Sequence, residues 1–165
     1  MRLLRLAAGV LAVGLGWMAE GRAQAVETAR CDVPIIHAIR GDQGKSQSID
    51  PRIDRLKGFF EKEPFIAWRE FKLLDRKELQ FNGAGESKFK LPNGREATLS
   101  FVEHLRGVEP SDHRMRLRLQ MEAKDKSHRM LDTTFVLEEG GVVLQGGQHY
   151  QNGVLILAIS CKTQE

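Results

Sequence analysis

The chain has 165 residues, of which 41% are hydrophobic and 28% are charged. Its 25 lysines and arginines exceed its 22 aspartates and glutamates by three, but three of those basic residues and one acidic residue fall within the first 25 positions. The remaining 140 residues carry 22 basic and 21 acidic side chains, a net charge of +1, which argues against a nucleic-acid-binding protein whose affinity rests on many phosphate contacts.

The first 25 residues have the pattern of a secretory signal peptide. Two arginines open the segment, an uncharged run of 13 residues (6–18) follows, and a small-residue A-x-A cleavage site ends at Ala25. The uncharged run is shorter than the roughly 20 residues that cross a bilayer, so a membrane anchor is the less favoured alternative. We therefore expect an exported protein, periplasmic or extracellular, with residues 26–165 as a single β-rich domain.

Two cysteines, Cys31 and Cys161, stand near the ends of this expected domain. In an oxidising compartment such a pair favours a disulfide over a redox or metal site. Cys31 opens the apolar run CDVPIIHAI and Cys161 closes GVLILAISC. If these runs pair antiparallel, the cysteines lie opposite each other. We expect the two runs to be neighbouring strands, buried on both faces or beneath a helix.

The clearest helix signal follows the polar loop of residues 41–50. Asp50 is an N-cap residue and Pro51 suits the first helical position. The helix is expected to end near Glu63, because Pro64 follows. Its apolar face consists of Ile53, Leu56 and Phe60.

The rest of the chain predicts strands. WREFKLL, ELQFN and SKFKL have the pattern of short strands, and Pro92-Asn93-Gly94 predicts a turn into REATLSFVEHL. RMRLRLQMEA alternates between apolar and polar residues, as a strand with one buried face does, and RMLDTTFVL, VVLQ and VLILAIS complete the series. The predicted fold class is α+β, mainly antiparallel: a sandwich or partly closed barrel of eight or nine strands with one N-terminal helix covering one end.

Three arginines share the polar face of RMRLRLQMEA. Arg114, Arg116 and Arg118 are spaced about 6.8 Å apart, twice the rise per residue of an antiparallel strand. Such a row could bind an anionic ligand or partner. The favoured alternative is a solvated face neutralised by neighbours such as Glu96 or Glu122.

The segment GGQHY lacks the spacing of a nucleotide-binding loop. We interpret it as part of a turn between strands, because the hairpin signal Asn152-Gly153 follows it. The alternative is a partner-contact loop in which glycines, having no side chain, allow a partner to approach the backbone closely. That loop would consist of Gly146, Gly147, His149 and Tyr150, with Gln148 between them.

No catalytic, cofactor-binding or metal-ligating residue is assigned, because no histidine pair has ligand spacing and no serine elbow occurs. His104 and His113 flank a predicted hairpin loop, but strand parity places them on opposite faces unless a bulge intervenes. His37, in an apolar run, is expected to be a half-buried structural residue.

The ordered segments IIHAIRG, IDPRIDRLKGFF, LPNG and GGVVLQGGQHYQNGVLILAIS resemble a pattern in small exported β-rich bacterial proteins of unassigned activity. VVLQGGQHYQNG is also similar to strand-glycine-strand segments of envelope-assembly proteins such as secretins. The resemblance implies a compartment and a general class, and no residue role.

The leading hypothesis is a non-catalytic exported binding or envelope-assembly accessory protein without a cofactor. Its partner would be another envelope protein or an anionic envelope component, bound through a sheet face or an exposed edge. The alternative is a small secreted hydrolase or glycan-processing enzyme whose site forms only in the fold. A pocket in which His149, Tyr150 and a carboxylate converge would favour the enzyme.

Overall fold

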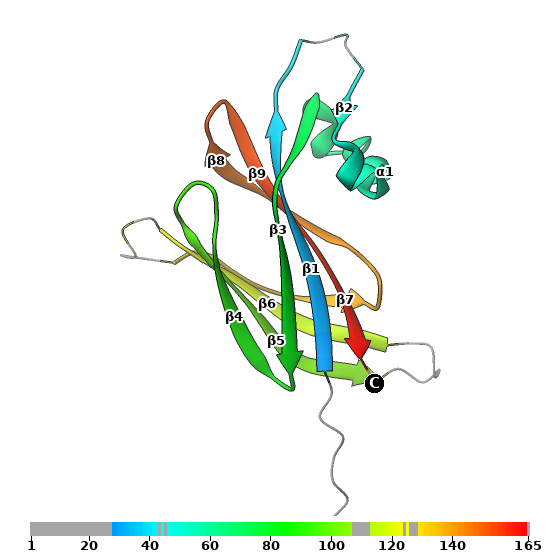
Figure 1. Cartoon of the computed structure of the whole chain (residues 1–165), viewed down its shortest axis with the longest axis vertical. Helices are drawn as coiled ribbons and strands as arrows, with labels where there is room; N and C mark the ends of the chain where they lie inside the picture. The colour runs from blue at the N-terminus through cyan, green and yellow to red at the C-terminus, as the bar shows by residue number, and fades with distance from the viewer. Residues whose placement is uncertain are drawn as a thin grey trace, which may run out of the picture.

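The computed structural model describes residues 28–42, 44, 46–106, 113–123, 125 and 129–164. Within these ranges nine strands and three short helical segments form (Figure 1). The strands are β1 (Thr28–Ile39), β2 (Ser48–Ile49), β3 (Glu70–Asn82), β4 (Gly85–Lys90), β5 (Glu96–Arg106), β6 (His113–Glu122), β7 (Arg129–Glu138), β8 (Val143–Tyr150) and β9 (Gly153–Gln164). The helical segments are η1 (Pro51–Leu56), α1 (Lys57–Phe60) and η2 (Phe65–Ala67). The predicted signal peptide lies outside the described residues and stays a prediction.

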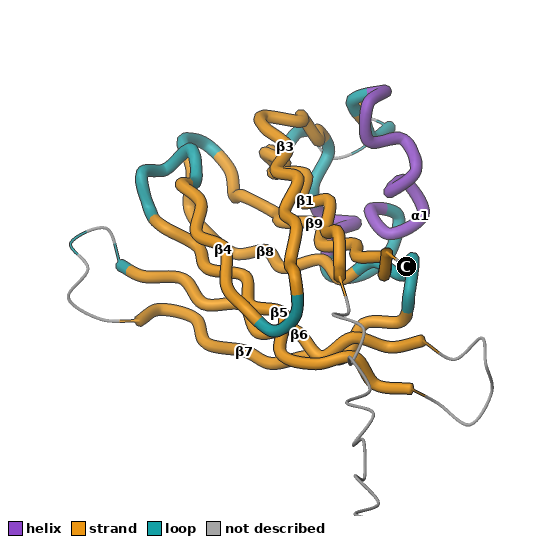
Figure 2. The backbone as a smooth tube through the Cα atoms, turned by 60° about the horizontal axis from the view of Figure 1, so that its bottom comes forward, coloured by secondary structure: helices purple, strands orange, loops and turns teal. Residues whose placement is uncertain are grey.

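The strands form two sheets. One has five strands in the order β2-β3-β1-β9-β8, and the other has four in the order β4-β5-β6-β7. All neighbouring pairs are antiparallel except β2 and β3, which run parallel. Figure 2 shows the two layers, with the helical segments beside the five-stranded sheet and away from β6 and β7. The prediction of a mainly antiparallel β fold is confirmed, and its form is that of a sandwich without a closed barrel.

The main core lies between the two sheets. The alternation predicted in β6 is confirmed, since its odd-numbered apolar side chains are buried and face the five-stranded sheet. Alternation of this kind gives one buried face and one solvated face. The buried side chains of this strand are Met115, Leu117, Leu119 and Met121, and Ala123 follows directly after it.

The first and last strands are neighbours, as predicted, and β1 pairs with β9 over nearly its whole length. Cys31 is the register partner of Cys161, and the two form a disulfide with a Cα–Cα distance of 4.0 Å. Both faces of these strands are covered in the part where β1 residues 35–38 pair with β9 residues 154–157. Ile35 belongs to the core between the sheets, and Ile36 belongs to a second core under the helical segments.

The predicted helix start is confirmed, but its type and place differ. The backbone N–H of Arg52 donates to Asp50 Oδ1 at 3.0 Å, and Pro51 follows the cap. The first six residues form a 3-10 helix, and the α-helix covers only four. The segment follows β1 and β2, so it is not N-terminal. Because so short a helix cannot stabilise itself, packing holds it.

That packing involves the three apolar residues predicted to share a face. Ile53, Leu56 and Phe60 are fully buried against the outer face of the five-stranded sheet. Phe60 stacks on Phe71 of β3 with ring centroids 4.0 Å apart. No helix in the described ranges is long and apolar enough to cross a bilayer.

Two strands predicted as separate are one. ELQFN and all of WREFKLL from Glu70 onward belong to the continuous strand β3, which pairs along its length with β1. A bulge opposite Ile35 and Ile36 absorbs one residue of β3. The charged middle of β3 misled the prediction, since alternate side chains of a strand reach solvent even where its backbone is fully paired.

Candidate functional site

A groove of about 380 Å³ lies on the outer face of the five-stranded sheet. Neighbouring residues of β1, β3 and β9 line it, and Arg55 of η1 closes one side. Of its charged lining residues, three are basic and two are acidic, an excess of one positive charge. The polar lining includes Arg30, Asp32, Arg55, Glu78, Ser160 and Lys162.

Strand register brings these side chains together. On β1, Arg30 is the register partner of Lys162, and Asp32 is the partner of both Ser160 and Glu78. These positions share the face of the sheet opposite to the disulfide, because successive side chains of a strand alternate. Sequence analysis missed the groove, although the predicted pairing of Cys31 with Cys161 implies the neighbouring pair of Arg30 and Lys162.

Most charges of the groove are paired. Arg55 Nη2 donates to Asp32 Oδ2 at 2.6 Å, and Arg30 forms an ion pair with Glu78. Arg76 of β3 also approaches Asp32, with Nε 3.6 Å from Oδ1. Lys162 has no ion-pair partner among the described residues. Its ammonium group is therefore available to a ligand.

Two polar side chains lie at the floor of the groove. Asp32 Oδ1 is buried and accepts no hydrogen bond from any described residue. The Ser160 side chain, on the neighbouring strand, is only 8% exposed. The Asp32 side chain as a whole is 31% exposed, so the groove presents a carboxylate that a hydroxyl or amine of a ligand can approach.

The arginine row lies on the outer face of the four-stranded sheet, and two of its members are neutralised within the sheet. Arg116 forms an ion pair with Glu103, and Arg118 makes a bidentate contact with Asp132 at 2.6 and 2.7 Å. The hydrogen bonds from Arg118 hold the pKa of Asp132 far below its usual range. These partners replace the suggested Glu96 and Glu122.

The register explains the change of partner. A bulge between Phe101 and Glu103 moves Glu103 directly opposite Arg116. Arg114 is the register partner of Leu105 on one side and of Glu138 on the other. That the row binds an anionic ligand or partner stays a prediction, but such a ligand would have to compete with carboxylates already in place.

The GGQHY segment is strand and not loop, so its interpretation as a turn was wrong. Gly146 and Gly147 lie within β8, and the turn to β9 comes later, at Gln151 and Asn152. The glycines mark a bulge in the pairing with β9, where Gly147 adopts a φ of 108°. Glycine adopts this conformation at no steric cost, and the hairpin signal alone could not locate the bulge.

The last two residues of the segment are neighbours on a strand, so their side chains point to opposite faces. His149 is exposed, whereas Tyr150 is partly buried against the main core. The Tyr150 ring packs edge-on against His37, with centroids 5.0 Å apart. The pocket in which His149 and Tyr150 would converge is therefore not formed by these positions.

His37 is more deeply buried than predicted, with only 4% of its surface exposed. Burial lowers its pKa from the usual value, and a hydrogen bond with the Tyr150 backbone partly offsets this. Its Nε2 lies 2.8 Å from the place where a Cβ at Gly153 would stand. The residue is a structural contact between β1 and the β8–β9 hairpin.

The histidines at the end of the sandwich are close together, against expectation. His104 and His113 stack with ring centroids 5.2 Å apart, because the bulge after Phe101 reverses the parity of β5. Glu139 lies near both rings, and its pKa is lowered mainly by hydrogen bonds from Thr163 and to a lesser degree by the histidines. No group of three or more candidate metal ligands occurs in the described part of the chain.

The fold and groove together define a two-sheet antiparallel β protein with a positively charged groove beneath a 3-10 helix. Comparison with protein-family models, with curated proteins and with solved structures found no match. The resemblance to exported bacterial proteins and to secretin-like segments therefore stays a prediction, and the function is argued from the groove.

Proposed function

We propose that this protein is an exported, non-catalytic binding protein that holds a hydroxylated anion in the groove, such as an acidic sugar of an envelope polysaccharide. The observation that carries the proposal is the direct opposition of Arg30 and Lys162 across β1 and β9. The Cys31–Cys161 disulfide beneath the same strands supports an oxidising compartment outside the cytosol.

The two cations explain why the ligand is an anion. Like charges directly opposite on neighbouring strands are unfavourable, and Glu78 offsets only the charge of Arg30. A carboxylate placed between Arg30 and Lys162 would accept charge-assisted hydrogen bonds from both, which are stronger than neutral ones. Binding would remove the repulsion and add two attractive contacts.

The floor of the groove explains why the anion carries hydroxyl groups. The Asp32 carboxylate is 31% exposed in the groove, and Ser160 lies beside it on β9. A sugar hydroxyl can donate to the carboxylate and accept from the serine at the same time. A uronic acid unit combines these hydroxyls with the carboxylate that Arg30 and Lys162 require.

A second candidate function, glycan hydrolysis, uses the same groove. Asp32 and Glu78 are register partners, and glycosidases place two carboxyl groups on either side of the scissile bond. We favour binding because each carboxylate already contacts an arginine, Arg55 or Arg30. One oxygen of each carboxylate, Asp32 Oδ2 and Glu78 Oε2, is therefore held by an arginine of the protein.

The proposal is tested by calorimetric titration of the secreted, oxidised protein with an oligogalacturonate, and with a neutral maltooligosaccharide of equal length as control. We expect binding of the acidic oligomer only, weakening with salt because the groove charges are exposed to solvent. Lys162→Gln is expected to weaken binding about tenfold, which corresponds to about 1.4 kcal/mol. Lys88→Gln, an exposed lysine on β4 of the other sheet, is the matched control.

Two results would overturn the proposal. One is equal binding of the acidic and neutral oligomers, and the other is unchanged affinity in Lys162→Gln. Analysis of the acidic oligomer after prolonged incubation separates the two candidate functions. An intact oligomer agrees with binding alone, whereas shortened products would favour hydrolysis at Asp32 and Glu78.

A further inference from the structure

The described sheets end in four edge strands, β2 and β8 in one sheet and β4 and β7 in the other. Exposed edges invite pairing with another strand, and proteins protect them by short length, lysines or bulges. β2 has only two residues, β4 carries exposed Lys88 and Lys90, and β8 contains the bulge at Gly147. Because β2 covers only Glu70 and Phe71, the rest of β3 is an edge as well, and it carries the exposed Lys72 and the bulge opposite Ile35 and Ile36. All of these edges are protected.

β7 is different. Its register with β6 is regular from Leu131 to Glu138, and the bulge that involves Met130 lies at its beginning. Figure 2 shows β7 at the lower margin of the molecule with no strand beyond it. Among the large exposed hydrophobic residues of the described chain, two belong to this strand: Met130 is 45% exposed and Val136 is 46% exposed.

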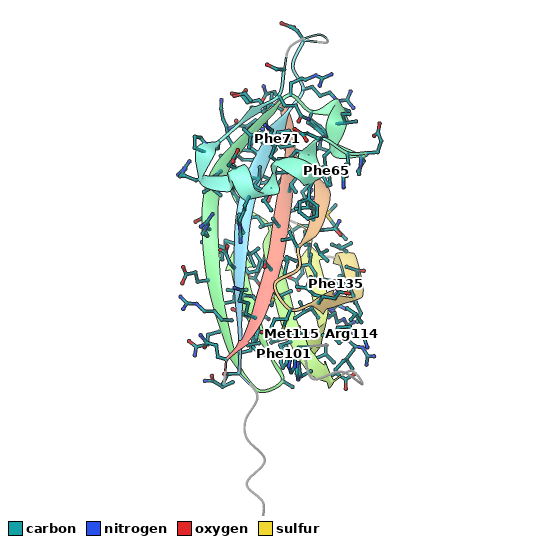
Figure 3. All side chains as sticks on the ribbon, turned by 90° about the vertical axis from the view of Figure 1, so that its right-hand side faces the viewer. Phe65, Phe71, Phe101, Arg114, Met115 and Phe135 are labelled. Atoms are coloured by element: carbon teal, nitrogen blue, oxygen red, sulfur yellow. A yellow bond between two sulfur atoms is a disulfide. The ribbon has the colours of Figure 1, made fainter. Side chains whose placement is uncertain are left out.

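The sequence of β7 is self-complementary about Thr133. In an antiparallel pair of two β7 strands with Thr133 opposite its own copy, Leu131 faces Phe135 and Met130 faces Val136. Leu131 and Phe135 are partly buried against the main core, and Figure 3 labels Phe135 on this strand. Each apolar residue of the central segment therefore meets an apolar residue of the partner.

Other antiparallel registers are unfavourable because Asp132 is the acidic residue near the centre of the strand. Centring the pair on Asp132 places it opposite its own copy, and centring on Phe135 places it opposite Glu138. Centring the pair on Thr134 places the Asp132 carboxylate opposite the apolar Val136. Like charges directly opposite destabilise a sheet, so the register about Thr133 is the favoured one.

In that register Asp132 lies opposite Thr134. The two Asp132 carboxylates are diagonal neighbours across the two-fold axis, about 7 to 8 Å apart by sheet geometry. Each is already neutralised within its own chain by Arg118 at 2.6 Å and Arg129 at 2.8 Å. The charge of the edge therefore does not oppose the pairing.

We infer that β7 is a docking edge for a second copy of this chain, and that two four-stranded sheets join through β7 into one continuous sheet. Such a contact is isologous, since the same residues are contributed by both copies. The contact is small and its rim is polar, so a dissociation constant in the micromolar range, on the order of 10 to 100 µM, is expected. The inference is independent of the groove, which lies on the other sheet.

The register is tested by cross-linking. Thr133→Cys places two thiols directly opposite, at a Cα separation of roughly 4.5 to 5.5 Å that suits a disulfide. Thr134→Cys is the control, because its side chain is more exposed but faces Asp132 of the partner. The native cysteines are fully buried and already bonded. Under mild oxidation we expect the Thr133→Cys protein to form covalent dimers at least tenfold faster.

Affinity is measured by sedimentation equilibrium from about 1 µM to about 1 mM, the range that brackets the expected constant. Val136→Lys, at an exposed position, is expected to weaken association at least tenfold. Leu74→Lys, which changes an exposed leucine on β3, is expected to leave it unchanged. A monomer at the highest concentration, or equal cross-linking by the two cysteine variants, would overturn the inference.

Discussion

Removal of the disulfide is the perturbation whose magnitude follows most directly from the fold. Cys31 and Cys161 are separated by 130 residues, so their bond closes nearly the whole described chain. The chain-entropy model gives a loss of about 17 cal/mol/K for a loop of this length, or about 5 kcal/mol at 25 °C. Because ten register pairs already align β1 with β9 in the folded protein, the bond acts mainly on the unfolded chain.

The assay is guanidinium denaturation of the oxidised protein and of the double variant Cys31→Ala, Cys161→Ala. We expect the free energy of unfolding to fall by about 3 to 5 kcal/mol, with a steeper denaturant dependence because the unfolded chain expands. The native circular dichroism should not change. A loss below about 1 kcal/mol, or a changed native spectrum, would show that the bond does not act through the unfolded chain.

Three further predictions concern the core. Gly153→Ala should lower the free energy of unfolding by about 3 kcal/mol, because its Cβ would stand 2.1 Å from the Ala38 carbonyl oxygen. Gly58→Ala, whose Cβ would have no atom within 4 Å, should raise it by up to about 1 kcal/mol. Equal effects of the two variants in thermal denaturation would contradict this. In urea denaturation, Leu119→Ala should lower the free energy of unfolding by about 2 to 5 kcal/mol, because Leu119 is fully buried. Val136→Ala, at an exposed position, should lower it by less than about 0.5 kcal/mol. A larger loss in Val136→Ala than in Leu119→Ala would contradict the assignment of the core. The lowered pKa of His37 means that the unfolded chain takes up a proton that the folded chain does not as the pH falls through 6.5, so stability should drop between about pH 7.5 and 5.5. His37→Gln should reduce that drop, and an unchanged drop would refute the assignment.

Local signals in the sequence predicted the structure correctly where a residue pattern has a single structural explanation. The strict alternation of β6 predicted its buried face, since a pleated strand divides its side chains between two faces. Asp50 followed by Pro51 located the start of the helical segment. The paired cysteines in apolar runs located the contact between β1 and β9.

Irregularities of pairing were not predictable in the same way. The bulge after Phe101 brought His104 onto His113 and Glu103 opposite Arg116, and no residue type marks it in the sequence. The bulge at Gly147 extended β8 through a segment that composition alone identified as a turn. A one-residue shift reverses the face of every later side chain, so small errors in register became large errors in site geometry.

The groove could not be predicted from the sequence, because residues from distant parts of the chain line it. Its floor comes from β1, β3 and β9, and its side from Arg55 of η1. The position of Arg30 beside Lys162 could have been predicted only by extending the antiparallel pairing of Cys31 with Cys161 by one residue. The edge complementarity of β7 is readable in the sequence once the strand is known to be an edge, which topology alone decides.

The most direct test of the proposed binding function is a two-dimensional ¹⁵N NMR titration of the oxidised protein with an oligogalacturonate. The account predicts that the largest shifts in the backbone amide signals fall on residues 30–32 and 160–162, with smaller changes near Arg55. Shifts concentrated on the arginine row, at Arg116 and Arg118, or no shifts at all, would contradict the assignment of the groove as the binding site.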